Sequence, residues 1–278
     1  EWDYRIIKTG DSLAVGPGKE LVFVEMPMLH WPDSMASFLT GDNILFSNDA
    51  FGQHFAVEEL FNDKADQCLL FGEAIKYYAN ILTPFQAVAK RKLEEIIGMN
   101  LPIEIIAPSH GVIWRDNPLQ IVEKYVEWSN QYQEDQITIA YDTMWDSTKK
   151  LAHRLAAELR DLAPDTVVKV MNVSQVDKND LMTEVFKSKA IAVGSPTVGN
   201  DILSSVAGWL YFLKELRFKG KKGAAFGSYG WSGEGNTKII AQLQEAGFEV
   251  VEPSVRVQWN PKEEELDQMR AVAEALVK

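Results

Sequence analysis

The stretch ITIAYDTMWDSTKKLAHRLAAELRDL, residues 137–162, joins a β-rich apolar run to a segment whose apolar residues recur at helical spacing. The same succession of strand and helix repeats four more times before residue 278. The later predicted strands occupy 166–173, 190–196, 222–233 (where the strand runs into a glycine-rich loop) and 249–259, and the later helices 178–188, 201–216, 236–248 and 262–278. Five strands that alternate with five helices predict an open parallel sheet covered by helices on both faces.

In sheets of this kind, ligands bind beyond the carboxyl ends of the strands, where the strand order reverses. Three of the predicted strand ends carry unusual loops. After the first strand, hydroxyl groups and the backbone N–H groups of 144–148, which open a helix, offer a phosphate site without a basic residue. GSPTVGN (194–200) is a proline-stiffened turn after the third strand. GSYGWSGEG (227–235), after the fourth, adds aromatic rings that can cover a flat ring system, as can Trp145 in the first loop.

Each of these loops alone has an ordinary explanation as a helix cap or a glycine turn. Together they predict a site for flavin mononucleotide (FMN), and the lack of a G-x-G-x-x-G fingerprint in the sequence disfavours a dinucleotide. The predicted cofactor-binding residues are Thr143, Met144, Trp145, Asp146, Ser147, Thr148, Ser195, Pro196, Thr197, Val198, Gly199, Asn200, Ser228, Tyr229, Gly230, Trp231, Ser232 and Gly233.

The first half of the chain carries three candidate metal ligands. His30 lies in PMLHWPDS (27–34), Asp49 in FSNDAFGQH (46–54) and His110 in APSHGVIW (107–114). Each alone could be a hydrogen-bonded core histidine or a turn-forming acid. Together they follow strand-to-loop junctions, where sites on a rigid β scaffold are built, and imidazole with carboxylate suits zinc, manganese or non-haem iron.

Composition and charge limit the class of protein. The 278 residues suggest two domains, which we expect over 1–135 and 136–278, with the polar stretch NQYQEDQ (130–136) near the boundary. The net charge is −12, and residues 1–135 alone hold 10 Lys or Arg against 21 Asp or Glu, which argues against nucleic acid or an anionic membrane as a partner. Cys68 is the single cysteine, which favours the reducing cytoplasm.

No apolar run reaches the roughly 20 residues that span a bilayer, and the N-terminus does not read as a signal peptide. EWDYRIIKTGDSLAVG (1–16) reads as strand, turn and strand without a cap or leader, like the middle of a domain.

The motifs MLHWPDSM, NDAFGQH, KYYANILTPF, SHGVIWRDNP, YDTMWDST, VGSPTVGND and AFGSYGWSG together resemble those of the flavodiiron proteins. The second half resembles flavodoxin, and the first half looks like part of a metallo-β-lactamase-like αββα domain. The resemblance implies FMN and two irons as cofactors. It assigns His30 and His110 as iron ligands and Asp49 as a bridging ligand. His54 does not match a ligand position, so we expect it to support the ligands or to lie at the surface, and we expect His153 to face solvent.

The resemblance also has a gap, because the family's upstream H-x-E-x-D-H run, which supplies the other iron ligands, is absent from these 278 residues. We expect a fragment of a longer protein rather than a vestigial site. For the complete protein the resemblance implies reduction of dioxygen to water, nitric oxide to nitrous oxide, or both. Rubredoxin or reduced deazaflavin F420 would supply electrons to a head-to-tail homodimer or homotetramer, with Trp231 either between the two centres or packed on the flavin.

Two other classes remain open at this point. One is a flavodoxin-like electron carrier with a vestigial lactamase-like domain. The other is a metallohydrolase of the glyoxalase II type, for which the flavin loops would have no use. Metal and flavin analysis would distinguish the three classes. Iron with flavin would indicate the reductase, flavin alone the carrier, and zinc the hydrolase.

Overall fold

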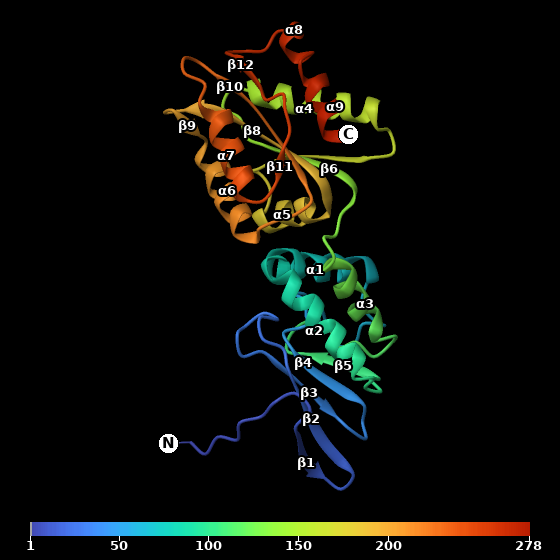
Figure 1. Ribbon diagram of the computed structural model, residues 1–278. Coiled ribbons are helices and arrows are strands. Elements are labelled where there is room, and N and C mark those ends of the chain that lie inside the picture. The colour runs from blue at the N-terminus through green and yellow to red at the C-terminus, as the bar shows by residue number, and fades with distance from the viewer. Residues whose placement is uncertain (1) are drawn as a thin grey trace. The chain divides into compact units, whose positions relative to one another are not determined.

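A computed structural model of the chain describes residues 2–278 (Figure 1). The chain divides into two compact units, the first ending at Asn130 and the second comprising Gln131–Lys278. The boundary expected between 135 and 136 falls inside the first strand of the second unit, which begins at Glu134. No helix within residues 2–278 has the length and apolar character to cross a membrane.

The first unit is built on a five-stranded sheet in the order β1-β2-β3-β4-β5. Successive pairs are antiparallel except β4 and β5, which are parallel because the helices α1 and α2 lie between them in the chain. The strands are β1 (Ser12–Gly16), β2 (Lys19–Glu25), β3 (Met35–Leu39), β4 (Ile44–Asn48) and β5 (Ile105–Pro108). The helical segments are α1 (Gln67–Tyr77), η1 (Tyr78–Leu82), η2 (Thr83–Phe85), α2 (Gln86–Gly98) and α3 (Leu119–Trp128).

The two faces of this sheet differ in burial. One face carries Val24, Ala36, Phe38, Leu45 and Ile106, each at most 2% exposed. The register places a second apolar row on the other face, where each member directly opposes the next and all are half-buried or exposed: Leu13, Leu21, Leu39, Ile44 and Ile105. Among the described residues, this sheet therefore has one covered face and one open apolar face, whereas a β-sheet with two apolar faces normally packs on both.

The strand expected before the turn at residues 9–10 does not form. Residues 2–8 have no regular secondary structure, and Trp2, Tyr4 and Ile6 are at least 80% exposed. A strand needs a neighbour to pair its backbone groups, and β1 pairs only with β2 in the described part of the chain. The second half of that expectation, at Ser12–Gly16, is correct.

The second unit confirms the predicted α/β fold with a parallel sheet. Its strands run in the order β11-β10-β8-β6-β7, with β12 also paired to β10 and the short β9 paired antiparallel to β8. The strand order reverses beside β6, as in other doubly wound sheets. The strands are β6 (Glu134–Tyr141), β7 (Val167–Asn172), β8 (Ser188–Val198), β9 (Asp201–Ile202), β10 (Lys222–Tyr229), β11 (Glu249–Val250) and β12 (Val255–Gln258).

Helices cover both faces of this sheet (Figure 1). A cluster of fully buried side chains, among them Ile139, Leu155, Phe226 and Val272, joins one face to α4 and α9. The remaining long helices, α5, α6 and α7, contact the sheet or one another on the other side. The helices are α4 (Ser147–Leu162), α5 (Lys178–Lys187), α6 (Ser204–Leu216), α7 (Gly235–Glu245), α8 (Glu263–Leu266) and α9 (Met269–Val277).

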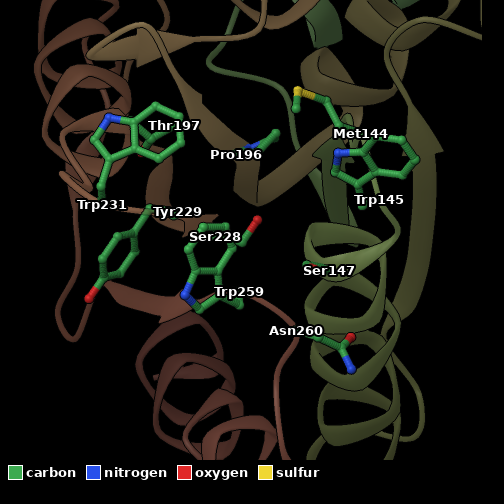
Figure 2. Close-up of a pocket in the computed structure, with 11 residues that line it drawn as sticks. Met144, Trp145, Ser147, Pro196, Thr197, Ser228, Tyr229, Trp231, Trp259 and Asn260 are labelled. Atoms are coloured by element: carbon green, nitrogen blue, oxygen red, sulfur yellow. The ribbon is translucent and has the colours of Figure 1, made fainter.

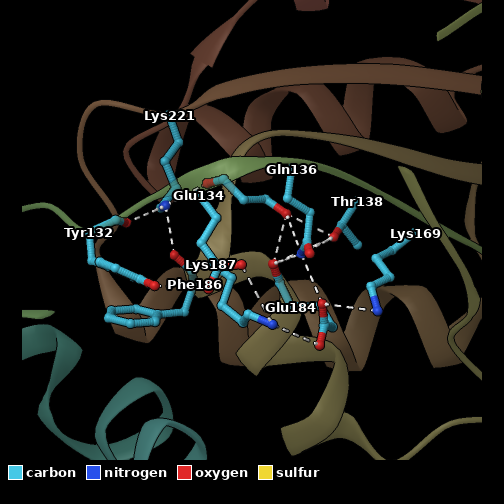
Figure 3. Close-up of polar contacts among 10 residues, drawn as sticks. Tyr132, Glu134, Gln136, Thr138, Lys169, Glu184, Phe186, Lys187 and Lys221 are labelled. Carbon is cyan, nitrogen blue, oxygen red and sulfur yellow. Dashed lines mark hydrogen bonds and ion pairs between the residues drawn. The ribbon is translucent and has the colours of Figure 1, made fainter. Parts of the chain in front are cut away.

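A buried lysine side chain lies at the amino ends of the parallel strands (Figure 3). Lys221 is 4% exposed, and its Nζ donates hydrogen bonds to the carbonyl oxygens of Tyr132 (3.0 Å), Phe186 (2.8 Å) and Ser188 (2.6 Å). Burial lowers the pKa of Lys221 to about 7, although the charge of Glu134 acts in the opposite direction. The three carbonyls satisfy all the donors of the ammonium group, so Lys221 ties β10, β8 and the entry to β6 together.

Candidate functional site

The carboxyl ends of the parallel strands surround a cavity of about 440 Å³ (Figure 2). Met144, Trp145 and Ser147 reach it from the β6–α4 loop, and Pro196 and Thr197 from the end of β8. The end of β10 and the loop after it contribute four more residues, namely Ser228, Tyr229, Gly230 and Trp231. The structure thus brings the three predicted loops to one cavity lined by indole, phenol and hydroxyl groups.

The other predicted residues do not line this cavity, and several of them fix its walls. The Thr148 and Ser228 hydroxyls lie 3.0 Å apart, which joins the first turn of α4 to the end of β10. Ser195, fully buried, accepts a hydrogen bond from Leu203 N (3.0 Å) and donates one to Pro196 O (2.9 Å). The predicted residues outside the lining are Thr143, Asp146, Thr148, Ser195, Val198, Gly199, Asn200, Ser232 and Gly233.

The start of α4 is suited to an anion. Asp146 precedes the helix in the left-handed region (φ 61°), and its side chain makes no capping hydrogen bond, so the first backbone N–H groups are not capped by it. The Thr143 hydroxyl is buried and has no hydrogen-bond partner among the described residues. The backbone N–H of Thr143 donates a hydrogen bond to Asp142 Oδ1 (2.8 Å), which fixes the conformation of the loop. A phosphate group would satisfy both the orphaned hydroxyl and the open helix terminus.

Sequence reasoning missed two residues of this cavity, Trp259 and Asn260. They follow β12, which pairs in parallel with β10 through Tyr229 and Gln258, so they reach the same edge of the sheet. The signal that could have found them was the end of the last predicted strand at 259, because all five parallel strands end at this edge.

The first unit brings the three predicted ligands together. His30 Nε2 lies 3.5 Å from Asp49 Oδ2, and His110 Nε2 lies 3.7 Å from Asp49 Oδ1. Each carboxylate oxygen therefore faces a different imidazole, at separations that fit two ligands sharing a cation with bonds of about 2.1 Å. Within residues 2–278, no group of three or more His, Cys, Asp or Glu side chains could hold a metal ion by itself. With one imidazole nitrogen facing each carboxylate oxygen, the arrangement could offer one nitrogen and one oxygen to each of two cations.

The Gln53 side chain connects the loops that carry Asp49 and His110 by hydrogen bonds. Gln53 is fully buried; its Nε2 donates to Phe51 O (2.8 Å) and its Oε1 accepts from Val112 N (2.9 Å). The Gln53 carbonyl lies 3.0 Å from His110 Nδ1. Because a carbonyl can only accept, Nδ1 carries the proton in the neutral ring, and the lone pair of Nε2 is free for a metal.

Close packing beside His110 requires glycine. A Cβ on Gly52 would lie 2.8 Å from His110 Cε1 and 3.0 Å from the Asp49 carbonyl oxygen. Contacts shorter than 3.0 Å essentially do not occur for real Cβ atoms, so a larger residue would displace the imidazole or the turn. Gly52 N also donates to Asp49 O (3.1 Å), which closes the turn that presents the carboxylate.

Tyr77, at the end of α1, is an unpredicted neighbour of these residues. Its ring centroid lies 6.2 Å from that of His30 and 5.2 Å from that of His110. The hydroxyl is buried without a hydrogen-bond partner in the described residues, and its pKa is raised by burial and then by the Asp49 charge. His54 is exposed, with its ring 5.2 Å from that of His110, and the expectation that His153 is exposed is confirmed.

Comparison with known proteins matches both units. The flavodoxin family model matches residues 139–271, and the ODP family beta lactamase model matches residues 3–111. The anaerobic nitric oxide reductase flavorubredoxin of Vibrio vulnificus is 50% identical over 278 residues, which are all of this chain and 56% of that protein. The protein of the same name in Klebsiella pneumoniae is 51% identical over 97% of this chain and 56% of its own length. The chain thus spans little more than half the length of these relatives.

Solved structures agree with these matches over nearly the whole chain. The flavodiiron protein of Giardia intestinalis has a TM-score of 0.91 and 30% identity, over 98% of this chain and 66% of its own. Rubredoxin oxygen:oxidoreductase of Desulfovibrio gigas has a TM-score of 0.95 and 37% identity, over 99% of this chain and 69% of its own. The chain therefore belongs to the flavodiiron protein family, whose cofactors are FMN and a diiron centre.

Proposed function

We propose that the full-length protein reduces nitric oxide to nitrous oxide, dioxygen to water, or both, at a diiron site that receives electrons through FMN. The flavin takes electrons singly and holds two, and a ferrous pair can bind and reduce a small diatomic gas. Support comes from the names of the relatives, which are nitric oxide and oxygen reductases. The observation that carries the proposal is Asp49, whose two oxygens face two different imidazoles.

In this proposal the chain's own residues position the irons and the gas. Asp49 would hold both cations through its two carboxylate oxygens, and its negative charge would offset part of their mutual repulsion. His30 and His110 would each hold one cation through Nε2, and the Gln53 carbonyl keeps His110 in the tautomer that this requires. The buried Tyr77 hydroxyl has no hydrogen-bond partner among the described residues, so it is available to donate to an oxygen atom bound beside His30 and His110.

The cavity of the second unit would hold the FMN. The open start of α4 and the Thr143 hydroxyl would receive the phosphate, while Trp145, Tyr229 and Trp231 would flank the isoalloxazine ring. Hydroxyl and indole groups of these loops orient the cofactor and exclude water from it. Trp231, which is exposed on the last of them, is suited to contact a neighbouring centre or a partner protein.

The proposal extends to assembly. Two irons need more ligands than His30, Asp49 and His110, and we expect these from the part of the relatives' length that the 278 residues do not span. We also expect a head-to-tail homodimer or homotetramer, in which the FMN of one subunit serves the irons of the next. Rubredoxin or reduced F420 would be the electron donor. The cytoplasm would be the location of the protein.

The test is gas consumption by the full-length protein with reduced rubredoxin, together with its metal and flavin content. Two irons and one FMN per chain, with consumption of nitric oxide or oxygen, are expected. FMN without iron and without gas consumption would instead favour an electron carrier with a vestigial metal domain. Zinc without FMN would favour a hydrolase. Repeating the assay with Asp49→Ala protein ties the activity to the proposed bridge.

A further inference from the structure

The segment after β12 forms a wall of the flavin cavity that comes from none of the three predicted loops. Trp259 and Asn260 line this cavity together with Ser228 and Gly230 (Figure 2). The Trp259 side chain is 64% exposed although its backbone is firmly held, so most of the indole is available to a molecule in the cavity. A large exposed ring on a fixed backbone is a common feature of recognition surfaces.

The position of the Trp259 indole is set by the last residue of β10 and the loop that follows it. Trp259 N donates to Tyr229 O (2.8 Å), and Gln258 Nε2 donates to Gly230 O (2.8 Å). Trp259 itself has a left-handed backbone (φ 61°). A Cβ on Gly230 would lie 2.9 Å from Cη2 of the indole, so the ring packs directly on the glycine backbone. The wall and the aromatic loop therefore form one rigid piece.

Asn260 connects the same segment to the helix at the phosphate end. Its Oδ1 accepts a hydrogen bond of 2.6 Å from Lys150 Nζ, in the first turn of α4. The preceding lysine, Lys149, instead lies 3.9 Å from Asp146. Of these two lysines, only Lys150 links the segment between β12 and α8 to α4. Lys149 carries the same charge at the adjacent position of the helix, so it can serve as a control.

From these contacts we infer that Trp259 and Asn260 are FMN-positioning residues. The indole contacts the isoalloxazine ring, and the Lys150–Asn260 hydrogen bond holds this wall against the helix that receives the phosphate. The inference rests on the FMN site described above and adds a fourth chain segment to it. Because an apolar ring disfavours an adjacent negative charge, Trp259 also lowers the midpoint potential for forming the anionic reduced flavin.

The test measures cofactor binding to full-length protein from which FMN has been removed reversibly, by quenching of flavin fluorescence. Trp259→Ala should weaken FMN at least ~10-fold, the effect of losing one aromatic stacking partner on a bound base. The affinity for riboflavin, which lacks the phosphate, should fall by the same factor in Trp259→Ala because the indole contacts the isoalloxazine ring. Trp259→Phe should restore most of the affinity. Tyr211→Ala, which removes an exposed aromatic outside the cavity, is the matched control and should change nothing.

The link to α4 is tested by two lysine variants. Lys150→Met should weaken FMN about threefold, the value of one hydrogen bond, while Lys149→Met removes the same charge and should have no effect. In the holoprotein, Trp259→Ala should raise the midpoint potential of the flavin. FMN and riboflavin affinities within twofold of the native values in Trp259→Ala would overturn the inference. Native protein that binds no FMN at all would instead overturn the proposed function as well.

Discussion

Both units place a candidate site at the ends of β-strands, but they differ in how far the sheet is covered and in how many of the residues that the site needs are present. In the second unit, helices cover both faces of the sheet, and every residue that lines the cavity at the strand ends belongs to the unit itself. In the first unit, one face of the sheet is open, and the candidate metal site offers three ligands for two cations. A site made from the strand ends of one doubly wound sheet is complete within about 150 residues. The candidate metal site of the first unit, by contrast, needs more ligands than these three to hold two irons.

Removing the Asp49 carboxylate should give the largest effect on iron binding. It tests whether His30, Asp49 and His110 form a metal site although three ligands cannot complete it. In full-length protein, Asp49→Ala leaves both imidazoles without the shared oxygen donor, so we expect iron binding to weaken at least ~100-fold. FMN content should not change, because no flavin-site residue is altered. Iron analysis and absorbance spectra measure both. Asp42→Ala, which removes an exposed carboxylate paired with Lys19, is the control, and iron retained by Asp49→Ala would refute the bridge.

The completeness of the second unit depends on Lys221, whose loss should give the next largest effect. Lys221→Met removes the Nζ donor from three carbonyls, two of them buried, and should lower the local stability of β10 by about 2–4 kcal/mol. Hydrogen exchange of the β10 amides in the full chain measures this. Lys222→Met, on the neighbouring and less buried residue, should cost much less.

The same lysine predicts a pH dependence. Its pKa is about 7 when folded and 10.5 when unfolded, so between these values the unfolded chain binds more protons. Stability should therefore rise with pH from about 7 to about 10, by at most ~1.4 kcal/mol per pH unit from this group. Lys221→Met should lack this rise. An equal slope in the two proteins would show that Lys221 stays charged in the folded unit.

A glycine pair tests how tightly the first unit supports its ligands. Gly52→Ala should displace His110 and weaken iron binding about 10-fold, since its Cβ would lie 2.8 Å from the imidazole. Gly72→Ala, in α1 with open space around the position, is the matched control and should stabilise the helix by about 0.5–1 kcal/mol. Unchanged iron affinity in Gly52→Ala would mean that the turn adapts without cost.

The smallest effect concerns the phosphate end of the flavin cavity. Thr143→Val keeps the shape of the side chain but removes the orphaned hydroxyl, and should weaken FMN about fivefold. Riboflavin should bind as before, because it has no phosphate. A loss that is equal for the two flavins would place Thr143 away from the phosphate and require another anion partner.

Much of the second unit could be predicted because its information is local. Each strand and helix follows its own periodicity, and the three loops adjoin strands that the sequence marks clearly. Trp259 and Asn260 escaped prediction because their role depends on β12 lying beside β10, a pairing between distant segments. The last predicted strand is divided into β11 and β12 around Glu252 and Pro253, where the proline was a strand-breaking signal that the prediction of one continuous strand did not use.

The first unit was harder because its site depends on tertiary contacts. His30, Asp49 and His110 could be proposed from motif resemblance, and the structure brings them together. Tyr77 lies within KYYANILTPF, one of the motifs that carry the resemblance, but the motif alone assigns it no role, since a helical tyrosine in an apolar segment is usually a core residue. The strand expected near the N-terminus failed for a related reason: alternation predicts a strand only where a neighbour is present to pair with it.

The uncovered row of Leu13, Leu21, Leu39, Ile44 and Ile105 has a practical consequence at the bench. Water in contact with so continuous an aliphatic strip favours self-association, so these 278 residues expressed alone should show concentration-dependent aggregation. Light scattering of a dilution series would reveal it, and polar replacements along the strip should improve solubility without disturbing the flavin.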